Sequence, residues 1–228
     1  MLGLFFALLI IRATYMSQVF DQDQQALFEQ LLMARRDVRG NHFLRNEPVT
    51  QDEIQRILEA AIWAPSVGFS QPWQFVVIRN EATKTKIANS FKIENAKAAH
   101  LFDERQQAYQ QLKLEGIHEA PVNIAVYYKD AGKPVLGQTS MQEMGEYSVV
   151  CAVQNMWLMA RAMNIGIGWV SILNPHTVNE VLNTPVGHKL VAYLCVGKVD
   201  EFLERPELEQ LKWDKRKQLD ELVVENSF

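Results

Sequence analysis

Three arginines and one aspartate gather within five residues near the start of the chain. Arg35, Arg36 and Arg39 surround Asp37, directly after a stretch that we expect to be helical. Guanidinium groups concentrated in this way can hold a phosphate through charge-assisted, bidentate hydrogen bonds. The alternative is a solvated surface patch in which Asp37 pairs with the arginines beside it. On this segment alone, both interpretations stay open.

A second cationic group lies close to the C-terminus. Lys215, Arg216 and Lys217 follow Trp213, and taken alone they are typical of an exposed basic turn. The two cationic groups become more informative if the fold brings them to one anion. We therefore treat both as candidates for a single phosphate site.

The segment APSVGFSQPW at residues 64–73 holds two prolines and a glycine. These residues interrupt regular helix and strand, so we expect a shaped loop between a helix and a core strand. Such a loop can present backbone N–H groups, the Ser66 hydroxyl and the Gln71 amide to a flat polar heterocycle. The alternative is an ordinary connection in which Trp73 packs into the core.

Several other kinds of site are missing from the sequence. It contains no phosphate-binding P-loop motif and no G-x-S-x-G nucleophile motif, and its five histidines lack the spacing of metal ligands. GIGWVS at residues 166–171 begins like a dinucleotide fingerprint, but it lacks the third glycine and leads from a helix into a strand. The net charge of −4 and the pI near 5.8 argue against a nucleic-acid partner.

The elements that must position these residues can be recognised along one continuous stretch of chain. Thr50 and Glu53 form a capping box, and the apolar spacing of residues 54–61 predicts an amphipathic helix that ends before Pro65. A polar stretch at residues 82–114 is helical in character. Runs of β-branched and aromatic residues predict strands at residues 75–78, 122–128, 166–172 and 190–196.

Residues 147–164 are apolar on nearly every side. This pattern predicts a helix that is buried in the middle of a domain or at a dimer interface. A short helix is expected at residues 175–182. Strands that alternate with helices, one of them central, predict a layered α+β domain.

The N-terminus and the two cysteines bear on where the protein works. Residues 1–11 are almost wholly apolar, but they fall short of the ~20 residues that span a bilayer as a helix, and they lack the basic leader of a secretion signal. We interpret residues 1–15 as a mis-called start, with a membrane-surface anchor as the alternative, and residues 16–228 as a single domain without stable membrane insertion. Cys151 and Cys195 lie in apolar runs, which predicts reduced core thiols in the cytoplasm.

Five motifs, in this order, resemble the nitroreductase-like flavoproteins: RRDVR, APSVGFSQPW, AVQNMWLMARA, GIGWVSI and AYLCVG. More narrowly they resemble the 5,6-dimethylbenzimidazole synthases. Asp37 stands where ordinary nitroreductases usually carry serine, and Gly68 stands where they often carry asparagine. The resemblance covers residues 16–228. It implies a nitroreductase-like layered α+β fold, with a mixed, mainly antiparallel sheet packed with helices around a central buried helix, in a homodimer.

The resemblance also implies an FMN site at the interface between two subunits. The arginine-rich segment and Arg216 would hold the phosphate, and the loop from Pro65 to Gln71 would reach the flavin from the second subunit. The implied FMN-binding residues are Arg35, Arg36, Asp37, Val38, Arg39, Pro65, Ser66, Gly68, Gln71, Trp169, Ser171 and Arg216. The implied catalytic residues are Asp37 and Ser171. Neighbouring guanidiniums favour the ionised form of Asp37, which would act as a base or orient the ribityl hydroxyls.

The implied activity consumes the flavin. Reduced FMN would react with molecular oxygen to give 5,6-dimethylbenzimidazole, the lower ligand of cobalamin, and erythrose 4-phosphate. FMN would then be a substrate, supplied in its reduced form by a separate NAD(P)H-dependent flavin reductase. Two alternatives stay open: a conventional NAD(P)H-dependent nitro- or quinone reductase that keeps its FMN, and a flavin-binding protein without turnover.

Overall fold

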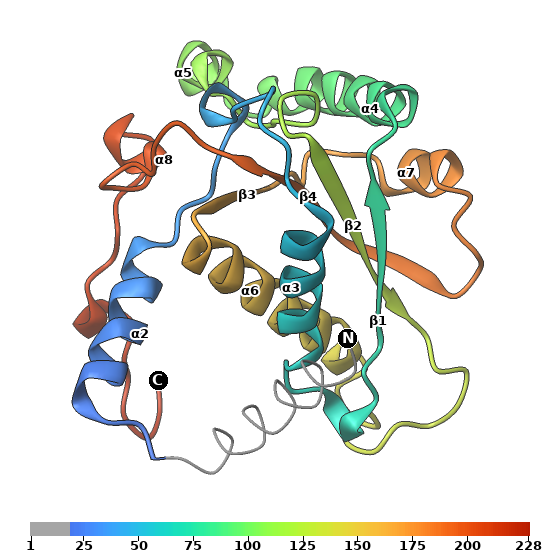
Figure 1. Ribbon diagram of the computed structural model, residues 1–228, viewed down its shortest axis with the longest axis vertical. Helices are drawn as coiled ribbons and strands as arrows, with labels where there is room; N and C mark the ends of the chain where they lie inside the picture. The colour runs from blue at the N-terminus through green and yellow to red at the C-terminus, as the bar shows by residue number, and fades with distance from the viewer. Residues whose placement is uncertain (1–18) are drawn as a thin grey trace. The chain divides into compact units, whose positions relative to one another are not determined.

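The computed structural model describes residues 19–228, and the chain divides into two compact units. The first unit ends at Ala34 and contains helix α2 (Gln22–Ala34), and the second unit spans residues 35–228 and contains the sheet (Figure 1). The leader predicted at residues 1–15 lies outside the described residues. The boundary between residues 15 and 16 therefore stays a prediction.

Helix α2 carries several exposed apolar side chains. No residue of this helix is buried, and the side chains of Leu27 and Phe28 are 67% and 53% exposed. Exposed large apolar side chains on one helix face are typical of a surface that packs against a partner.

The sheet has four strands in the order β1-β2-β4-β3, and every neighbouring pair is antiparallel. The strands are β1 (Trp73–Ile78), β2 (Val122–Lys129), β3 (Ile165–Trp169) and β4 (His188–Lys198). All four lie where the sequence predicts strands. Within residues 19–228, the parallel component of the predicted mixed sheet is the bridge between Asp37 and Ile167.

The third strand ends earlier than predicted. We expected strand to residue 172, but β3 ends at Trp169. The Val170 N–H still bonds the Tyr193 carbonyl at 2.8 Å, and the chain then turns tightly, with the Leu173 N–H donating to the Ser171 carbonyl at 2.9 Å. Apolar composition does not reveal this turn.

The helices follow the predicted pattern, and α3 begins at the predicted capping box. Thr50 Oγ1 accepts from the Glu53 N–H at 3.2 Å, and the Thr50 N–H donates to Glu53 Oε2 at 2.9 Å. The α-helices of the second unit are α3 (Gln51–Ile62), α4 (Glu81–Ala99), α5 (Gln106–Gln111), α6 (Met144–Ala162), α7 (Pro175–Val181) and α8 (Glu207–Gln210). Short 3-10 helices lie at η1 (Gly40–His42), η2 (Val67–Phe69), η3 (Asp103–Arg105) and η4 (Leu219–Glu221).

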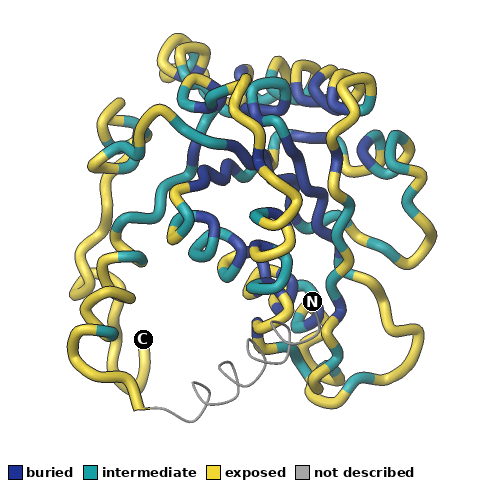
Figure 2. The backbone as a smooth tube through the Cα atoms, in the orientation of Figure 1, coloured by how far each residue is buried: buried dark blue, intermediate teal, exposed yellow. Residues whose placement is uncertain are grey.

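Two apolar cores lie on opposite faces of the sheet. Side chains alternate along β2: Ile124 and Val126 join the core with α3 and α6, whereas Ala125 and Tyr127 join the core with α4 and α7. Figure 2 shows the buried residues concentrated on the strands and on the helix faces turned toward them. The predicted layered α+β architecture is confirmed.

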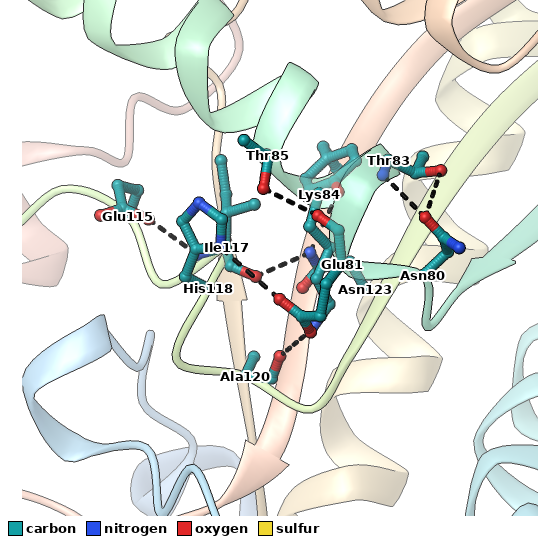
Figure 3. A network of polar contacts seen from close by, with 11 residues as sticks. Asn80, Glu81, Thr83, Lys84, Thr85, Glu115, Ile117, His118, Ala120 and Asn123 are labelled. Atoms are coloured by element: carbon teal, nitrogen blue, oxygen red, sulfur yellow. Dashed lines mark hydrogen bonds and ion pairs between the residues drawn. The ribbon is translucent and has the colours of Figure 1, made fainter.

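A buried lysine braces the second core. Lys84 on α4 is 0% exposed, and its Nζ donates to Glu81 Oε1 and to the Ala120 carbonyl, both at 2.8 Å (Figure 3). His118 approaches the other oxygen of Glu81 at 3.7 Å. Burying a lysine is tolerable here because its charge is paired and hydrogen-bonded. The polar composition of residues 82–114 predicts a helix but does not single out this residue.

Helix α6 is central, yet one of its sides is open in the single chain. Val149, Val153 and Met156 are fully buried, whereas Tyr147 is 50% exposed and Val150 40% exposed. The predicted central helix is therefore confirmed, but the single chain does not cover it on every side.

Both cysteines are free thiols. Cys195 lies in the core, as predicted. Cys151 is exposed on the open side of α6, so its prediction as a core thiol is wrong. An apolar run predicts burial on average, but it does not say which side of a helix the fold covers.

Within residues 19–228, no helix is both long and apolar enough to cross a membrane.

Candidate active site

The arginine-rich segment lies along β3. The Val38 N–H donates to the Ile167 carbonyl at 3.0 Å, beside the parallel bridge from Asp37 to the same residue. The contact is so close that a Cβ on Gly168 would lie 2.0 Å from the Val38 carbonyl oxygen. Gly168 is therefore required for backbone packing. This packing accounts for Gly168 in GIGWVS without any role in binding a dinucleotide.

Asp37 is fixed at both oxygens. Its Oδ1 accepts from the Trp169 N–H at 2.9 Å, and its Oδ2 pairs with Arg39. Burial raises the pKa of Asp37, and the Arg39 guanidinium and the Trp169 N–H offset part of that rise. The neighbouring guanidiniums thus favour the ionised form of Asp37, as predicted, but burial has the larger effect on the pKa of this carboxyl.

Arg39 is largely committed to the protein itself. Its Nη1 donates to the carbonyls of Leu114 at 3.1 Å and Trp169 at 3.0 Å, and its Nη2 pairs with Asp37. These contacts leave little of the guanidinium for a ligand. Arg39 braces the segment and its aspartate.

Arg36 connects the segment to the C-terminal part of the chain. Its Nε donates to the Leu203 carbonyl at 2.8 Å, and its Nη2 donates to the Glu204 carbonyl. Burial lowers the pKa of Arg36, and the nearby positive charges of Arg35, Arg216 and Arg161 lower it further. Mutual repulsion of this kind is relieved when an anion binds among the cations.

Arg35 lies over an aromatic ring. Its guanidinium carbon is 4.9 Å from the ring centroid of Trp157, which lies on α6. The Trp157 Nε1–H donates to the carbonyls of both Arg36 and Ile167 at 3.0 Å. Trp157 therefore joins the arginine segment to β3 and also supports the Arg35 side chain by a cation–π contact.

The two cationic groups meet at one cavity of about 190 Å³. Its lining contains five cationic side chains against two carboxylates, which suits an anion with more than one negative charge. The lining residues are Arg35, Arg36, Asp37, Arg39, Leu112, Lys113, Pro206, Glu207, Leu208, Leu211 and Arg216. Sequence reasoning missed Lys113 and Glu207, because neither lies in a recognisable motif.

The loop at residues 64–73 is tightly shaped. Gly68, Phe69 and Gln71 all have positive φ, at 55°, 52° and 48°, which is unusual for the latter two residue types. Ser66 Oγ accepts from the Gln71 N–H at 3.0 Å, and the Val67 N–H donates to Ser148 Oγ on α6 at 3.0 Å. The predicted shaped loop is confirmed, and Trp73 is only partly buried beside the core.

This loop and the cavity lie at opposite ends of α6. Ser148, which holds the loop, stands nine residues before Trp157, which supports Arg35. Nine residues of α-helix correspond to about 14 Å along the axis. The lining of the cavity includes no residue of the loop, so a single chain does not unite Pro65, Ser66, Gly68 and Gln71 with the arginines.

Trp169 is the last residue of β3, and Ser171 lies two residues beyond the end of this strand. The ring of Trp169 lies 6.2 Å from that of Trp157, and its backbone N–H holds Asp37. Ser171 is exposed two residues further on and does not line the cavity. The structure therefore brings together the predicted arginines, Asp37, Val38 and Trp169, with Ser171 close by in the chain.

Comparison with known proteins places this arrangement in a family. The model of the nitroreductase family matches residues 32–198. The chain belongs to the nitroreductase family. The matched range contains Asp37 and the loop at residues 64–73, whereas Arg216 and the C-terminal part of the cavity lie beyond it.

Curated relatives indicate to which group within this family the chain belongs. The chain is 44% identical over 202 residues to a 5,6-dimethylbenzimidazole synthase of Rhodospirillum rubrum, covering 87% of this chain and 94% of the relative. It is 36% identical to a protein of the same name from Rhodobacter capsulatus, covering 85% of this chain and 94% of the relative. Within the nitroreductase family, the chain therefore belongs with the 5,6-dimethylbenzimidazole synthases.

Solved structures share the nitroreductase fold. Oxidised iodotyrosine deiodinase bound to FMN and 3-iodo-L-tyrosine superposes with a TM-score of 0.69 at 21% identity, over 88% of this chain and 99% of that chain. A BluB-like flavoprotein from Clostridium difficile gives a TM-score of 0.67 at 20% identity, over 86% and 97%.

Proposed function

We propose that this protein makes 5,6-dimethylbenzimidazole by oxidative fragmentation of reduced FMN in the cytoplasm. The observation that carries the proposal is the cavity in which Arg35, Arg36 and Arg216 converge beside Asp37, in a chain 44% identical to a 5,6-dimethylbenzimidazole synthase. Molecular oxygen would supply the oxidising equivalents. The other product would be erythrose 4-phosphate, which keeps the phosphate that the arginines hold.

The cationic cavity would bind the phosphate end of FMN. Arg35 and Arg216 line it, and Lys113 adds a charge from a third segment. Guanidiniums suit this ligand because they hydrogen-bond phosphate oxygens in pairs. When bound, FMN supplies the redox chemistry with oxygen, and these side chains fix its tail.

Asp37 would work at the ribityl chain. It is the aspartate beside the cations, and a raised pKa makes its carboxylate a stronger base. Removal of a four-carbon sugar phosphate from the five-carbon ribityl chain leaves one carbon, which would become C2 of the benzimidazole. Proton transfer is needed at the C–C bond that breaks, so we assign Asp37 this role.

Ser171 would donate a hydrogen bond near the flavin ring. It is exposed just beyond Trp169, on the segment that follows Asp37's partner strand. The rings of Trp169, Trp73 and Phe69 would shield the flavin from water. Phe69 is 82% exposed in the single chain, so this shielding requires a second subunit.

A homodimer would complete the site. The cavity of about 190 Å³ is smaller than the ~300–1,000 Å³ of usual small-molecule pockets. The open side of α6, with Tyr147 and Val150, offers an apolar surface for a second copy. The loop would then approach the flavin of the partner subunit, because it contacts the opposite end of α6 from the arginines of its own chain. The loop residues concerned are Pro65, Ser66, Gly68 and Gln71.

The test supplies reduced flavin and follows the products. The purified protein is incubated in air with FMN, NADPH and a separate flavin reductase, and the products are analysed by mass spectrometry. We expect the mass of dimethylbenzimidazole to appear as FMN disappears. Persistent FMN would refute the proposal; NADPH-dependent reduction of nitro compounds would then indicate a conventional reductase, and tight FMN binding without turnover would indicate a flavin-binding protein.

A further inference from the structure

The C-terminal side of the cavity is formed by a segment that buries no apolar side chain of its own. Pro206, Glu207, Leu208, Leu211 and Arg216 line the cavity, yet no residue from 204 to 216 is buried. Helix α8 within it has four residues. A segment with little buried apolar surface opens at low free-energy cost, so its position depends on the side chains that tie it down.

Two of these ties lie near the start of the segment. Arg36 Nε donates to the Leu203 carbonyl at 2.8 Å, and Asn41 Nδ2 donates to Glu207 Oε1 at 3.2 Å. Both act before α8. The position of Arg216 therefore depends on what holds the chain after α8.

An aromatic clasp, formed by Phe102, Arg105, Tyr109 and Trp213, holds that later part. The Arg105 guanidinium carbon lies 3.7 Å from the Trp213 ring centroid, and its Nη2 donates to the Trp213 carbonyl. The Trp213 ring meets Phe102 edge-on at 5.3 Å, and Phe102 stacks on Tyr109 at 4.9 Å. Such contacts have defined geometry, so they fix the direction as well as the position of the chain.

The clasp is anchored in the body of the protein. Tyr109 is buried, and its hydroxyl donates to Asn95 Oδ1 on α4 at 2.7 Å. Helix α4 contributes Ile87 and Phe91 to the second core. Trp213 is thus connected, through the rings of Phe102 and Tyr109, to helix α4, which is packed in the second core.

The clasp also links two segments that line the cavity. Leu112 and Lys113 follow α5 directly, three and four residues after Tyr109, and Arg216 follows Trp213 by three residues. Contacts at Trp213 therefore set the spacing between the Lys113 side and the Arg216 side of the cavity.

We propose that Trp213, gripped by Arg105 and Phe102, is a positioning residue that places Arg216 against the phosphate of FMN. The inference rests on the proposed function, which identifies the anion as that phosphate. Trp213 does not itself line the cavity, so its effect on binding must pass through Arg216 and the chain between them.

Comparison of FMN with riboflavin isolates the phosphate. Both affinities are measured by quenching of flavin fluorescence, and the ratio of the two dissociation constants reports the phosphate contact. We expect Trp213→Ala to weaken FMN binding by about 10-fold, within the range of a charge-assisted hydrogen bond, and to leave riboflavin binding unchanged. Arg105→Gln should weaken FMN binding by about 3-fold, as for an exposed cation–π contact. Lys92→Gln, which removes one exposed charge from α4, is the matched control and should change neither affinity.

A double-mutant cycle tests whether Trp213 acts through Arg216. In the Arg216→Gln background, Trp213→Ala should cause no further loss of FMN affinity, because the contact it positions is already absent. An equal loss in both backgrounds would overturn the inference, and so would equal weakening of FMN and riboflavin. If circular dichroism shows that Trp213→Ala does not fold, Arg105→Gln takes its place as the test. An unchanged ratio of the FMN and riboflavin dissociation constants in Arg105→Gln would then refute the positioning role of Trp213. A wild-type protein that binds both flavins equally would instead refute the phosphate site of the proposed function.

Discussion

Residues 35–39 and residues 206–216 both supply arginines to one cavity, but the fold holds them by different means. The first segment bonds to β3 through its backbone, and Val38 is buried in the core. The second segment has no buried residue and depends on side-chain ties. We infer that the first segment is the more rigid side of the cavity, whereas the second keeps its position through the contacts at Glu207 and Trp213.

The largest expected effect comes from breaking the rigid side. Gly168→Ala would place a methyl group 2.0 Å from the Val38 carbonyl oxygen, so the arginine segment must move away from β3. We expect a loss of about 3 kcal/mol or more in the free energy of unfolding, a drop of about 10 °C in Tm, and loss of product formation. Thermal unfolding by circular dichroism checks the first two.

Gly187→Ala is the control for this substitution. Its φ of +84° carries the strain of a left-handed residue, but a Cβ there meets open space. It should cost about 1 kcal/mol. Equal destabilisation by the two changes would contradict the packing role of Gly168.

The proposed proton transfer at residues 35–39 is tested by a substitution at Asp37. Asp37→Asn keeps the shape and removes the charge, and we expect kcat/KM to fall by about 100-fold, as for loss of a proton-transfer group. Because burial raises the pKa of Asp37, the wild-type kcat/KM should rise with pH through a pKa above the usual carboxyl range. That rise should vanish in the variant. Asp52→Asn, at an exposed position on α3, should behave as wild type; undiminished turnover in Asp37→Asn would refute the proton-transfer role.

A third pair of changes compares the two sides directly. Arg35→Gln and Arg216→Gln should each weaken FMN binding by about 10-fold or more, since each removes a charge-assisted contact. Arg35 is partly buried on Trp157, whereas Arg216 is exposed. Added salt should therefore reduce the contribution of Arg216 more than that of Arg35, because exposed charges are screened more strongly. FMN titrations of the wild type and both variants at low and high salt measure these two contributions. An identical salt dependence for Arg35 and Arg216 would contradict the difference in exposure that we infer for the two sides of the cavity.

The smallest expected effect is at Trp157. Trp157→Phe keeps a ring beneath Arg35 but removes the N–H that bonds the Arg36 and Ile167 carbonyls. We expect a loss of about 1–2 kcal/mol in unfolding free energy and only a few-fold weaker FMN binding. Chemical denaturation gives the first quantity. A large loss of FMN affinity without loss of stability would show that Trp157 contacts the ligand itself.

Predictions from local patterns agree closely with the structure. The capping box at Thr50 and Glu53, the four strands and the shaped loop all depend on neighbours within a few residues, so their signals are present in the sequence. Predictions about burial were less accurate. Cys151 is exposed although its sequence neighbours are apolar, and Lys84 is buried although its neighbours are polar. Burial depends on which helix face meets another element, and that contact involves residues far away in the sequence.

For the candidate site, the residue types were predictable but their grouping was not. The sequence by itself determined which side chains could hold a phosphate, at residues 35–39 and at Arg216, because charge and hydrogen-bonding capacity belong to each residue. Only the tertiary structure decided that these groups share one cavity, that Lys113 and Glu207 join them, and that burial outweighs the arginines at Asp37. The reason is physical: distance and solvent exposure set electrostatic energies, and both arise only when segments nearly two hundred residues apart pack together.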